Sequence, residues 1–304
     1  MNLRFVEAYY WAVTLKSITR AAERLYVTQS ALSSRIAALE DELGVLLLDR
    51  RDRQFRLTAA GTRFLRHAER LLALQREIRG ELGSPAERAD ALRVGVIESV
   101  LHSWLIDWVQ GLRREHPGLQ LELMVETTPV LLDHMRRGAA DLILAALPAD
   151  GDGIASRALA PMPMAFVGPA PARRGRALAF ADLAAGHELL TFQRGSQPHV
   201  ALLALCRREG VEAPRVHNIS SISAMVSLVE QGFGVATLPR AAVQRLAGTR
   251  ALAPVPVAAA LDPLPIQLSW RDDPSTPIVG RAVASVLAHD LQARGVSSKK
   301  SMRA

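Results

Sequence analysis

Apolar residues in the first 45 positions recur every three or four residues, in three short segments. Residues at that spacing share one face of a helix, so the pattern predicts three amphipathic helices. The second helix spans Ile18 to Leu25, and Thr28 can cap the third by accepting from its free N–H groups. Gly44 would end the third helix as a C-terminal cap. The apolar residues of the first and third helices are Leu3, Val6, Tyr10 and Val13, and Leu32, Ile36, Leu39 and Leu43.

Two helices joined by a tight turn predict a helix-turn-helix, and the third predicted helix is polar opposite its apolar face. Short hydrogen-bonding side chains and one guanidinium there suit base edges in the DNA major groove. Gln29 could form a bidentate pair with adenine, and Ser33 could bond a base edge or a phosphate; otherwise each is simply an exposed polar residue. Arg35 could contact phosphate or pair with a neighbouring acid. This polar face consists of Gln29, Ser30, Ser33, Ser34 and Arg35.

Residues 46–57 predict a wing, a small β-ribbon that follows directly on the third helix. Its arginines suit phosphate contacts or an adjacent minor groove. The alternative is a solvated charge run, which the position next to a recognition-like helix makes less favourable. The four arginines are Arg50, Arg51, Arg53 and Arg56.

A long helix is predicted from Thr58 to about Leu82, with apolar residues at alternating spacings of four and three. This a/d seam, interrupted by Gln75, favours a coiled coil between two copies of the chain, and a dimer would suit paired DNA half-sites. The alternative is a helix buried on its own domain. Gly83 to Ala86 would break the helix and act as a hinge. The seam consists of Phe64, Ala68, Leu71, Gln75, Ile78 and Leu82.

Beyond residue 91 strand and helix patterns alternate, which implies a parallel sheet with helices on its faces. A second block of the same kind begins near residue 165. We expect two similar α/β lobes with a cleft where they meet, and ligands outside the carboxyl ends of the strands. Strands are predicted at 92–97, 119–125, 141–146, 165–168, 189–192, 214–217, 234–238 and 264–270, and helices at 101–114, 130–137, 198–209, 222–231 and 277–292.

Charge and composition narrow the function classes. The formal net charge is +7, and most of the excess lies in residues 1–80, which favours a polyanionic partner. Cys206 is the single cysteine, which excludes an intramolecular disulfide and suits a reducing cytosol; its apolar neighbours predict that it is a packed core residue. No apolar signal-peptide core or transmembrane run is visible, so we expect a cytoplasmic protein without membrane contact.

Catalytic and cofactor motifs are absent from the sequence. The histidines lack metal-ligand spacing, and neither a Gly-rich phosphate loop nor a G-x-S-x-G turn occurs. We therefore expect no metal, no cofactor and no enzymatic activity.

Several motifs resemble the LysR-type transcriptional regulators. In the N-terminal part they are Ala21-Ala22-Glu23-Arg24-Leu25, Thr28-Gln29-Ser30-Ala31-Leu32-Ser33, Ile36 with Leu39-Glu40 and Leu43-Gly44, Arg50, and Leu57-Thr58-Ala59-Ala60-Gly61. Downstream they are Arg93-Val94-Gly95-Val96, Gly138 with Asp141-Leu142, and Gly232-Phe233-Gly234-Val235-Ala236 with Leu238-Pro239. The first set is highly specific, and the second matches more loosely.

The resemblance implies a multidomain α+β chain: a winged helix-turn-helix at 1–58, a linker helix and hinge at 59–90, and an effector domain at 91–295. The effector domain would be two-lobed α/β, like a type 2 periplasmic binding protein. Lobe I would cover about 91–161 and 266–295, and lobe II about 162–265. The polar, basic residues 296–304 would form a disordered tail.

The resemblance also implies a regulator that binds promoter DNA as a dimer of dimers, responds to a small molecule and contacts RNA polymerase. DNA contacts would come from Thr28, the polar face of the third helix, and the wing residues Arg50, Arg51 and Arg53. Dimer contacts would come from Phe64, Ala68, Leu71 and Ile78. Relatives often have proline at position 30 and a long polar residue at position 34, where this chain has Ser30 and Ser34, so base preference does not transfer.

Effector contacts are expected where strands end and helices begin. The resemblance points to Ser99 and Thr128, whose hydroxyls could hold a carboxylate beside free helix N–H groups, and plain N-capping is the alternative. Arg194 could pair with a ligand carboxylate or form a surface salt bridge. Glu98 would favour an amine over an anion, or pair with an arginine. The candidate effector residues are Glu98, Ser99, Thr127, Thr128, Arg194, Ser196 and Asn218.

Two other functions compete with a regulator. A solute-binding protein would account for the second half of the chain alone. It would leave the basic N-terminal module unexplained, and no signal-peptide core is visible. An α/β enzyme is disfavoured because no nucleophile and base stand in a recognisable motif.

Overall fold

The computed structural model describes residues 1–49, 55–82, 91–170, 177–212, 214–272 and 276–301. The chain divides into two units. The first contains residues 1–95, 111–157 and 268–288, and the second contains residues 96–110, 158–267 and 289–304. Among the described residues, no helix has the length and apolar character needed to cross a membrane.

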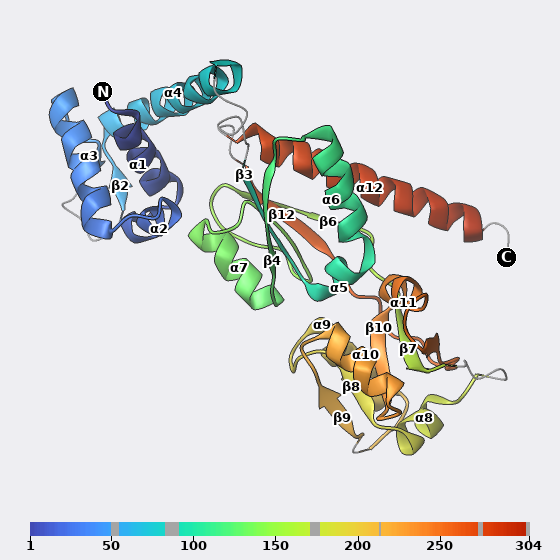
Figure 1. Cartoon of the computed structure of the whole chain (residues 1–304). Helices are drawn as coiled ribbons and strands as arrows, with labels where there is room; N and C mark the ends of the chain where they lie inside the picture. The colour runs from blue at the N-terminus through green and yellow to red at the C-terminus, as the bar shows by residue number, and fades with distance from the viewer. Residues whose placement is uncertain (50–54, 83–90, 171–176, 213, 273–275, 302–304) are drawn as a thin grey trace. The chain divides into compact units, whose positions relative to one another are not determined.

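The three predicted N-terminal helices are present and enclose one core (Figure 1). They are α1 (Leu3–Thr14), α2 (Ile18–Arg24) and α3 (Gln29–Leu43). Tyr26 adopts a φ of 52° in the turn between α2 and α3. The Thr28 hydroxyl accepts from the Ala31 amide at 3.2 Å, and Gly44 ends α3 with a φ of 66°. Both predicted caps are confirmed.

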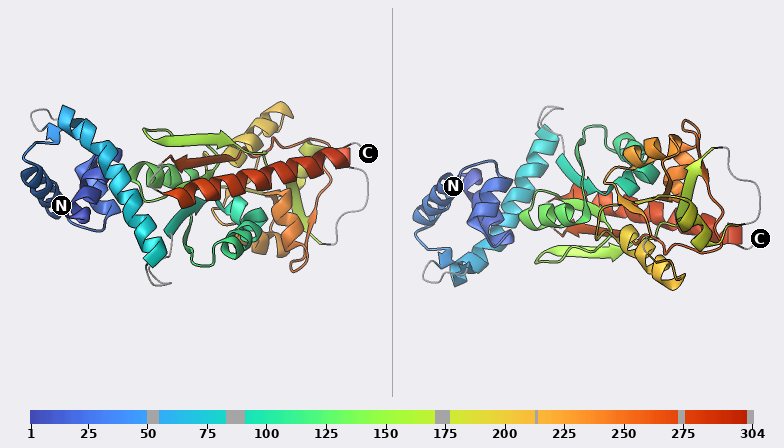
Figure 2. Two further views of the ribbon diagram at one scale, coloured as in Figure 1. Left: turned by 90° about the horizontal axis from the view of Figure 1, so that it is seen from above. Right: turned by 90° about the horizontal axis from the view of Figure 1, so that it is seen from below.

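The predicted wing and long helix are also present. Strands β1 (Leu48–Asp49) and β2 (Arg56–Leu57) pair antiparallel, and α4 (Ala59–Leu82) follows as one uninterrupted helix, cyan in Figure 2. The backbone comes so close at Gly61 that a Cβ there would lie 2.1 Å from the Leu47 carbonyl oxygen, so this position requires glycine.

The first half of α4 packs on its own domain. Ala68 is fully buried, and the rings of Phe64 and Tyr9 pack edge to face with centroids 5.4 Å apart. Phe64 and Ala68 were predicted as dimer contacts. Ala68 therefore belongs to the N-terminal core, whereas Phe64 is only half-buried against that core, so its dimer contact stays a prediction.

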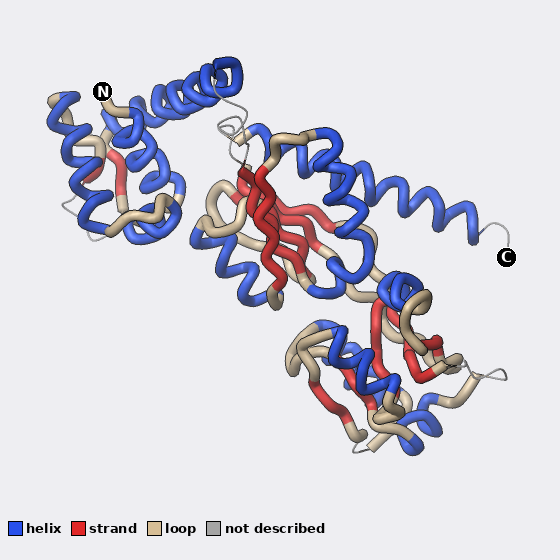
Figure 3. The backbone as a smooth tube through the Cα atoms, viewed as in Figure 1, coloured by secondary structure: helices blue, strands red, loops and turns tan. Residues whose placement is uncertain are grey.

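A five-stranded sheet in the order β4-β3-β5-β12-β6 forms the first α/β layer, and Figure 3 shows its strands in red. Four of the strands were predicted, whereas β6 was not, because its residues Ile-Ala-Ser-Arg-Ala lack the apolar alternation of a half-buried strand. The strands are β3 (Ala91–Val96), β4 (Gln120–Val125), β5 (Leu142–Ala145), β6 (Ile154–Ala158) and β12 (Gln267–Arg271).

The helices that accompany this sheet begin earlier or end later than predicted. The helix after β3 consists of α5 (Glu98–Val100), a π-helical turn η1 (Leu101–Leu105) and α6 (Ile106–Glu115). The next helix is α7 (Thr128–Arg137). The last, α12 (Pro277–Ser301), continues beyond residue 296, so the tail predicted as disordered is helical up to Ser301.

The second unit contains a mixed sheet in the order β11-β7-β10-β8-β9. Strand β10 runs parallel to β8 and antiparallel to β7, and β11 also runs antiparallel to β7. The strands are β7 (Met164–Pro169), β8 (Leu189–Thr191), β9 (Val216–Asn218), β10 (Val235–Pro239) and β11 (Leu252–Pro254). The helices are α8 (Phe180–Gly186), α9 (Gln197–Arg208), α10 (Ile222–Glu230) and α11 (Arg240–Leu246).

Candidate DNA interface and effector site

The first turns of α3 present polar side chains to solvent. Opposite them, Leu32, Ile36 and Leu39 are at most 1% exposed, which fixes the rotation of the helix. The polar residues Gln29, Ser30, Ser33 and Ser34 are therefore exposed together. Local contacts hold two of them: the Thr28 and Ser30 hydroxyls lie 3.1 Å apart, and the Thr19 hydroxyl lies 3.4 Å from the Gln29 amide oxygen. This surface offers donors and acceptors in the arrangement that groove recognition needs.

The basic residues predicted to contact DNA are only partly described. Arg35 is half-buried on α3. Arg50, Arg51 and Arg53 lie outside the described residues, so their prediction stays untested. Arg56 is exposed on β2.

Glu40 joins α3 to the wing, a role that the sequence pattern did not reveal. The side chain is 4% exposed, and its Oε1 accepts from the backbone amides of Leu47 and Leu48 at 2.8 and 3.0 Å. A buried carboxylate that accepts backbone N–H groups is well satisfied, and it fixes the start of β1 against the helix. The one sequence feature that could have indicated this role is the position of Glu40 directly after Leu39, which belongs to the apolar stripe of α3.

Beyond the wing, the apolar side chains of α4 become exposed. Leu71 is half-buried, while Leu74 and Ile78 are 51% and 47% exposed. The predicted dimer seam therefore remains available at Leu71 and Ile78, and Leu74 is added to it.

The candidate effector residues fall in both units. Thr127 and Thr128 belong to the first unit, and the other five belong to the second. Ser99 was predicted to cap a helix, which is wrong: Ile97 is the N-cap of α5, and Ser99 lies within the helix, 3% exposed. Thr127 stands at the N-cap of α7 without a capping bond from its side chain. The Thr128 hydroxyl accepts from the Ala146 amide at 3.2 Å, which joins α7 to the end of β5.

Glu98 is the best-defined of the candidates. Its Oε2 accepts from the backbone amide of Ile222 at 2.5 Å, at the N-terminus of α10. Its other oxygen, Oε1, lies 4.0 Å from the His102 Nε2. The predicted pairing with an arginine is not what the structure has; the carboxylate satisfies a free N–H group of a helix.

Three further candidates lie around α9 and β9. Ser196 is the N-cap of α9, since its hydroxyl accepts from the His199 amide at 3.4 Å. The Asn218 amide donates to the Phe192 carbonyl at 2.9 Å. Arg194 is exposed; burial lowers the pKa of the nearby His199, and the Arg194 charge lowers it further.

A cavity within the second unit lies elsewhere. It has a volume of about 500 Å³ and is lined mainly by apolar side chains from residues 163–166 and 254–263, with Arg240 and Gln244 as polar residues. None of the candidate effector residues lines it.

Cys206 is packed as predicted. It is 3% exposed in the core formed by α8, α9 and β8, and burial raises the pKa of its thiol. In the part of the chain that the structure describes, no three His, Cys, Asp or Glu residues cluster in a way that could hold a metal ion.

Comparison with known proteins matches both halves of the chain. The model of the bacterial regulatory helix-turn-helix protein, lysR family, covers residues 3–62, and the model of the LysR substrate binding domain covers residues 85–291. A probable hydrogen peroxide-inducible genes activator of Mycobacterium avium is 31% identical over 245 residues, 78% of each chain. The HTH-type transcriptional regulator GbpR of Azospirillum brasilense is 29% identical over 297 residues, 95% of this chain and 86% of the relative.

Solved structures show the same architecture over nearly the whole chain. A full-length OxyR variant from Pseudomonas aeruginosa superposes with a TM-score of 0.59 at 25% identity, covering 94% of this chain and 93% of that one. Full-length CbnR in complex with its target DNA superposes with a TM-score of 0.53 at 25% identity, covering 95% and 99%. The predicted order of a helix-turn-helix followed by an α/β effector-binding domain is confirmed.

Proposed function

This chain belongs to the family of LysR-type transcriptional regulators, and from that membership we propose that it recognises its operator through the first turns of α3. Members of this family are DNA-binding regulators with an effector-binding domain, not enzymes and not free-standing solute-binding proteins. The proposal therefore concerns which residues of this chain contact the operator.

One observation carries the proposal: α3 buries Leu32, Ile36 and Leu39 on one side and exposes a polar set on the opposite side. The exposed set is Gln29, Ser30, Ser33 and Ser34. A helix fixed in this way can enter the major groove with its polar N-terminal side chains toward the base edges. Gln29 supplies the donor and acceptor pair that adenine matches, and the serines suit either base edges or phosphates. Arg35 and the wing arginines Arg50, Arg51 and Arg53 would add phosphate contacts.

The test compares the affinity of the full-length protein for its operator with its affinity for unrelated duplex, by fluorescence anisotropy at several salt concentrations. Gln29→Ala should lower the ratio of the two affinities by about tenfold, since a bidentate base contact discriminates by roughly 1–3 kcal/mol. Asp41→Asn, also exposed on α3 but near its C-terminal end, is the matched control and should leave the ratio unchanged. An unchanged ratio in Gln29→Ala would mean that α3 does not read the sequence.

We also propose self-association through the exposed apolar side chains of α4, with two dimers pairing into a tetramer on DNA. Leu74 and Ile78, on the part of α4 that α1 does not cover, support this contact. A cytoplasmic location and a contact with RNA polymerase follow as proposals from the role of a promoter-bound bacterial regulator.

The effector, we infer, is a small molecule bound reversibly and not an oxidant that acts on a thiol. Relatives of this chain include hydrogen peroxide-inducible activators, so oxidation is the natural alternative. A sensor thiol needs exposure and a lowered pKa. Cys206 is the single cysteine, is buried, and has a raised pKa. Peroxide should leave operator binding unchanged; a response in the wild type that Cys206→Ser abolishes would refute this inference.

The contact of Glu98 with α10 bears on the charge of the effector. A carboxylate of the protein already occupies the N–H group that an anionic ligand would otherwise use. An anion would have to displace Glu98, whereas an amine or a neutral donor would not. Effector contacts are proposed for Glu98, Ser99, Thr127, Thr128, Arg194, Ser196 and Asn218.

A thermal-shift panel of small carboxylates and amines tests this idea on the full-length protein. Any ligand that binds the folded state raises its melting temperature. Carboxylates should stabilise Glu98→Gln more than the wild type, because the competing anion is gone. Glu126→Gln, exposed just beyond β4, is the control. Equal responses of the wild type and Glu98→Gln across the panel would contradict the role of Glu98.

A further inference from the structure

Three basic residues spaced four apart lie along one side of α2 and the turn before it. They are Lys16, Arg20 and Arg24, and we call them the α2 docking surface. Arg20 and Arg24 contact the corner of the effector domain between the end of α7 and the start of β5. Lys16 contacts Asp152 in the loop between β5 and β6, and all of these residues belong to the first unit. None of the three belongs to the polar turn of α3.

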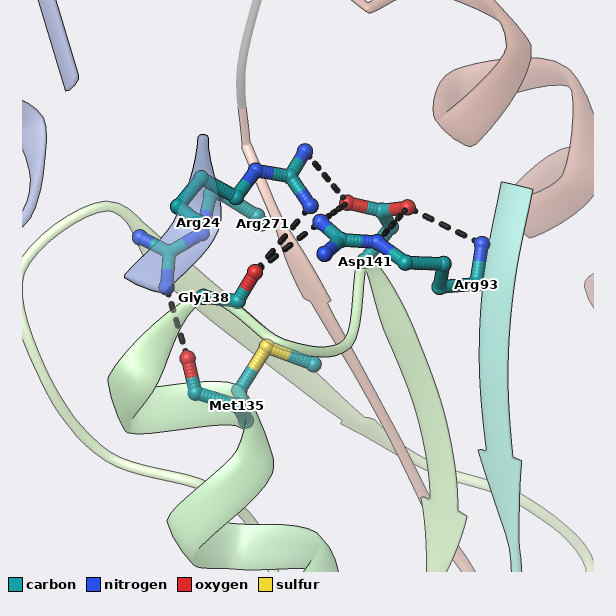
Figure 4. Close-up of polar contacts among 6 residues, drawn as sticks. All are labelled: Arg24, Arg93, Met135, Gly138, Asp141 and Arg271. Atoms are coloured by element: carbon teal, nitrogen blue, oxygen red, sulfur yellow. Dashed lines mark hydrogen bonds and ion pairs between the residues drawn. The ribbon is translucent and has the colours of Figure 1, made fainter. Parts of the chain in front are cut away.

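Arg24 makes the central contact (Figure 4). Its guanidinium donates to the Gly138 carbonyl and to the Asp141 carboxylate, both at 3.0 Å. The side chains of this pair are only 13% and 6% exposed. Within its own domain, the guanidinium stacks over the Trp11 ring, 4.4 Å from the centroid. This cation–π contact holds the side chain in place before it meets its partner.

The other two residues extend the contact to the end of α7 and to the loop between β5 and β6. Arg20 donates to the Arg136 carbonyl at 2.9 Å, and the Lys16 ammonium pairs with the exposed Asp152 carboxylate. The carbonyls of Arg136 and Gly138 belong to the C-terminal end of α7, which carries the negative end of the helix dipole. Apolar contact completes the surface, since a Cβ on Gly138 would lie 3.0 Å from the Leu15 Cδ2.

Both partners remain satisfied when they separate. Asp141 accepts from the Arg93 backbone amide at 2.9 Å and pairs with the Arg93 guanidinium at 3.0 Å, inside the effector domain. Burial raises the pKa of Asp141, and the Arg93 charge opposes that rise. Losing Arg24 would therefore not leave a buried charge alone, which is the usual cost of breaking a buried ion pair. Arg24 keeps its contact with Trp11.

We propose that the α2 docking surface binds the α7–β5 corner of the same chain reversibly, so that the effector domain sets the orientation of the DNA-binding domain. Docking engages three cationic side chains that would otherwise be free to bind phosphates, two of them with carboxylates and Arg20 with a backbone carbonyl. It leaves the exposed polar turn of α3 uncovered by these contacts. A shift of α7 would reach the DNA-binding domain directly through the carbonyls of Arg136 and Gly138. The proposal depends on neither the operator nor the effector, so it can fail while the proposed function stands.

Cysteine cross-linking of the full-length protein tests the proposal. Lys16 and Asp152 are replaced by cysteine in a Cys206→Ser background and joined with a short bismaleimide. Their exposed ion pair contributes little, so its loss should not undo docking. A mixture of light and ¹⁵N-labelled protein distinguishes a link within one chain from a link between copies. We expect same-chain links, formed more slowly as KCl rises.

Arg24→Gln should lower the docking equilibrium constant about tenfold or more, because it removes two charge-assisted hydrogen bonds. The KCl concentration that halves the cross-linking rate should fall accordingly. Arg20→Gln, on the same surface and away from Trp11, should shift it in the same direction if Arg24→Gln perturbs folding. Arg137→Gln is the matched control, since this arginine pairs with Asp133 on its own helix, at 2.9 Å. Absent links, links between copies, or a KCl midpoint unchanged in both test variants would overturn the proposal.

Discussion

Replacing Glu40 by alanine should detach the wing from the recognition helix. Leu47 and Leu48 are 1% and 6% exposed, and both donate their backbone N–H groups to one oxygen of Glu40. Alanine at position 40 leaves these two buried donors without that acceptor. The start of β1 would then lose its attachment to α3.

The expected cost follows from these two bonds. A hydrogen bond to a charged group contributes about 1.5–3 kcal/mol, so the two together set an upper value of about 6 kcal/mol. Water that enters the vacated space would satisfy part of the deficit, and we expect about 3 kcal/mol for Glu40→Ala. Glu40→Gln keeps an acceptor oxygen and loses only the charge, so roughly half of that loss is expected.

Hydrogen exchange of peptides from residues 29–49 of the full-length protein measures the free energy of local opening. Glu42→Ala is the matched control, because Glu42 is an exposed residue of the same helix that pairs with the N-terminal amine. Operator affinity should fall in the order wild type, Glu40→Gln, Glu40→Ala. If Glu40→Ala lowers the free energy of local opening no more than Glu40→Gln does, or no more than Glu42→Ala does, then Glu40 does not hold the wing.

Three further expectations concern separate parts of the chain. Burial raises the pKa of the Tyr9 hydroxyl, and the Glu40 charge raises it further. Above about pH 10 the unfolded chain loses this proton while the folded chain keeps it. The N-terminal domain should therefore lose stability as the pH rises beyond that value. Hydrogen exchange at alkaline pH should show this loss in the wild type and not in Tyr9→Phe. Ile78→Asp should weaken the dimer in sedimentation experiments, whereas an unchanged mass would place the interface elsewhere. The Cys206 thiol should react with a disulfide reagent only as fast as its domain unfolds, and rapid reaction of the native protein would contradict its burial.

The N-terminal helices were predictable because their signals are local. Caps such as Thr28 and Gly44 act within four residues, and the stripe that ends at Leu43 has helical period. The face of α4 was harder to assign, because its seam has the same spacing whether it packs on α1 or on a second chain. Ala68 belongs to the first case, because it is fully buried in the N-terminal core, whereas Phe64 packs on that core and stays partly exposed.

The effector residues were predicted less well, since their roles depend on partners far along the chain. Ser99 was expected to cap a helix, but the helix begins at Glu98, three residues before the start that the apolar pattern predicts. Glu98 meets the amide of Ile222, 124 residues away, and no local pattern encodes that contact. Its position next to a strand end drew attention to it, but its partner needed the fold.

The partners of the basic residues of α2 could not be predicted from the sequence either. Their four-residue spacing is visible in the sequence, and guanidinium groups suit phosphates, carboxylates and helix-end carbonyls alike. Only the fold brings Arg24 to Asp141, 117 residues away, and leaves Gln29 on a different, exposed surface. Because the two surfaces share no residue, orientation of the domain and reading of bases are separable. Arg24→Gln should therefore change the salt dependence of docking, while the preference among operator sequences, which depends on Gln29 and the serines of α3, stays as in the wild type.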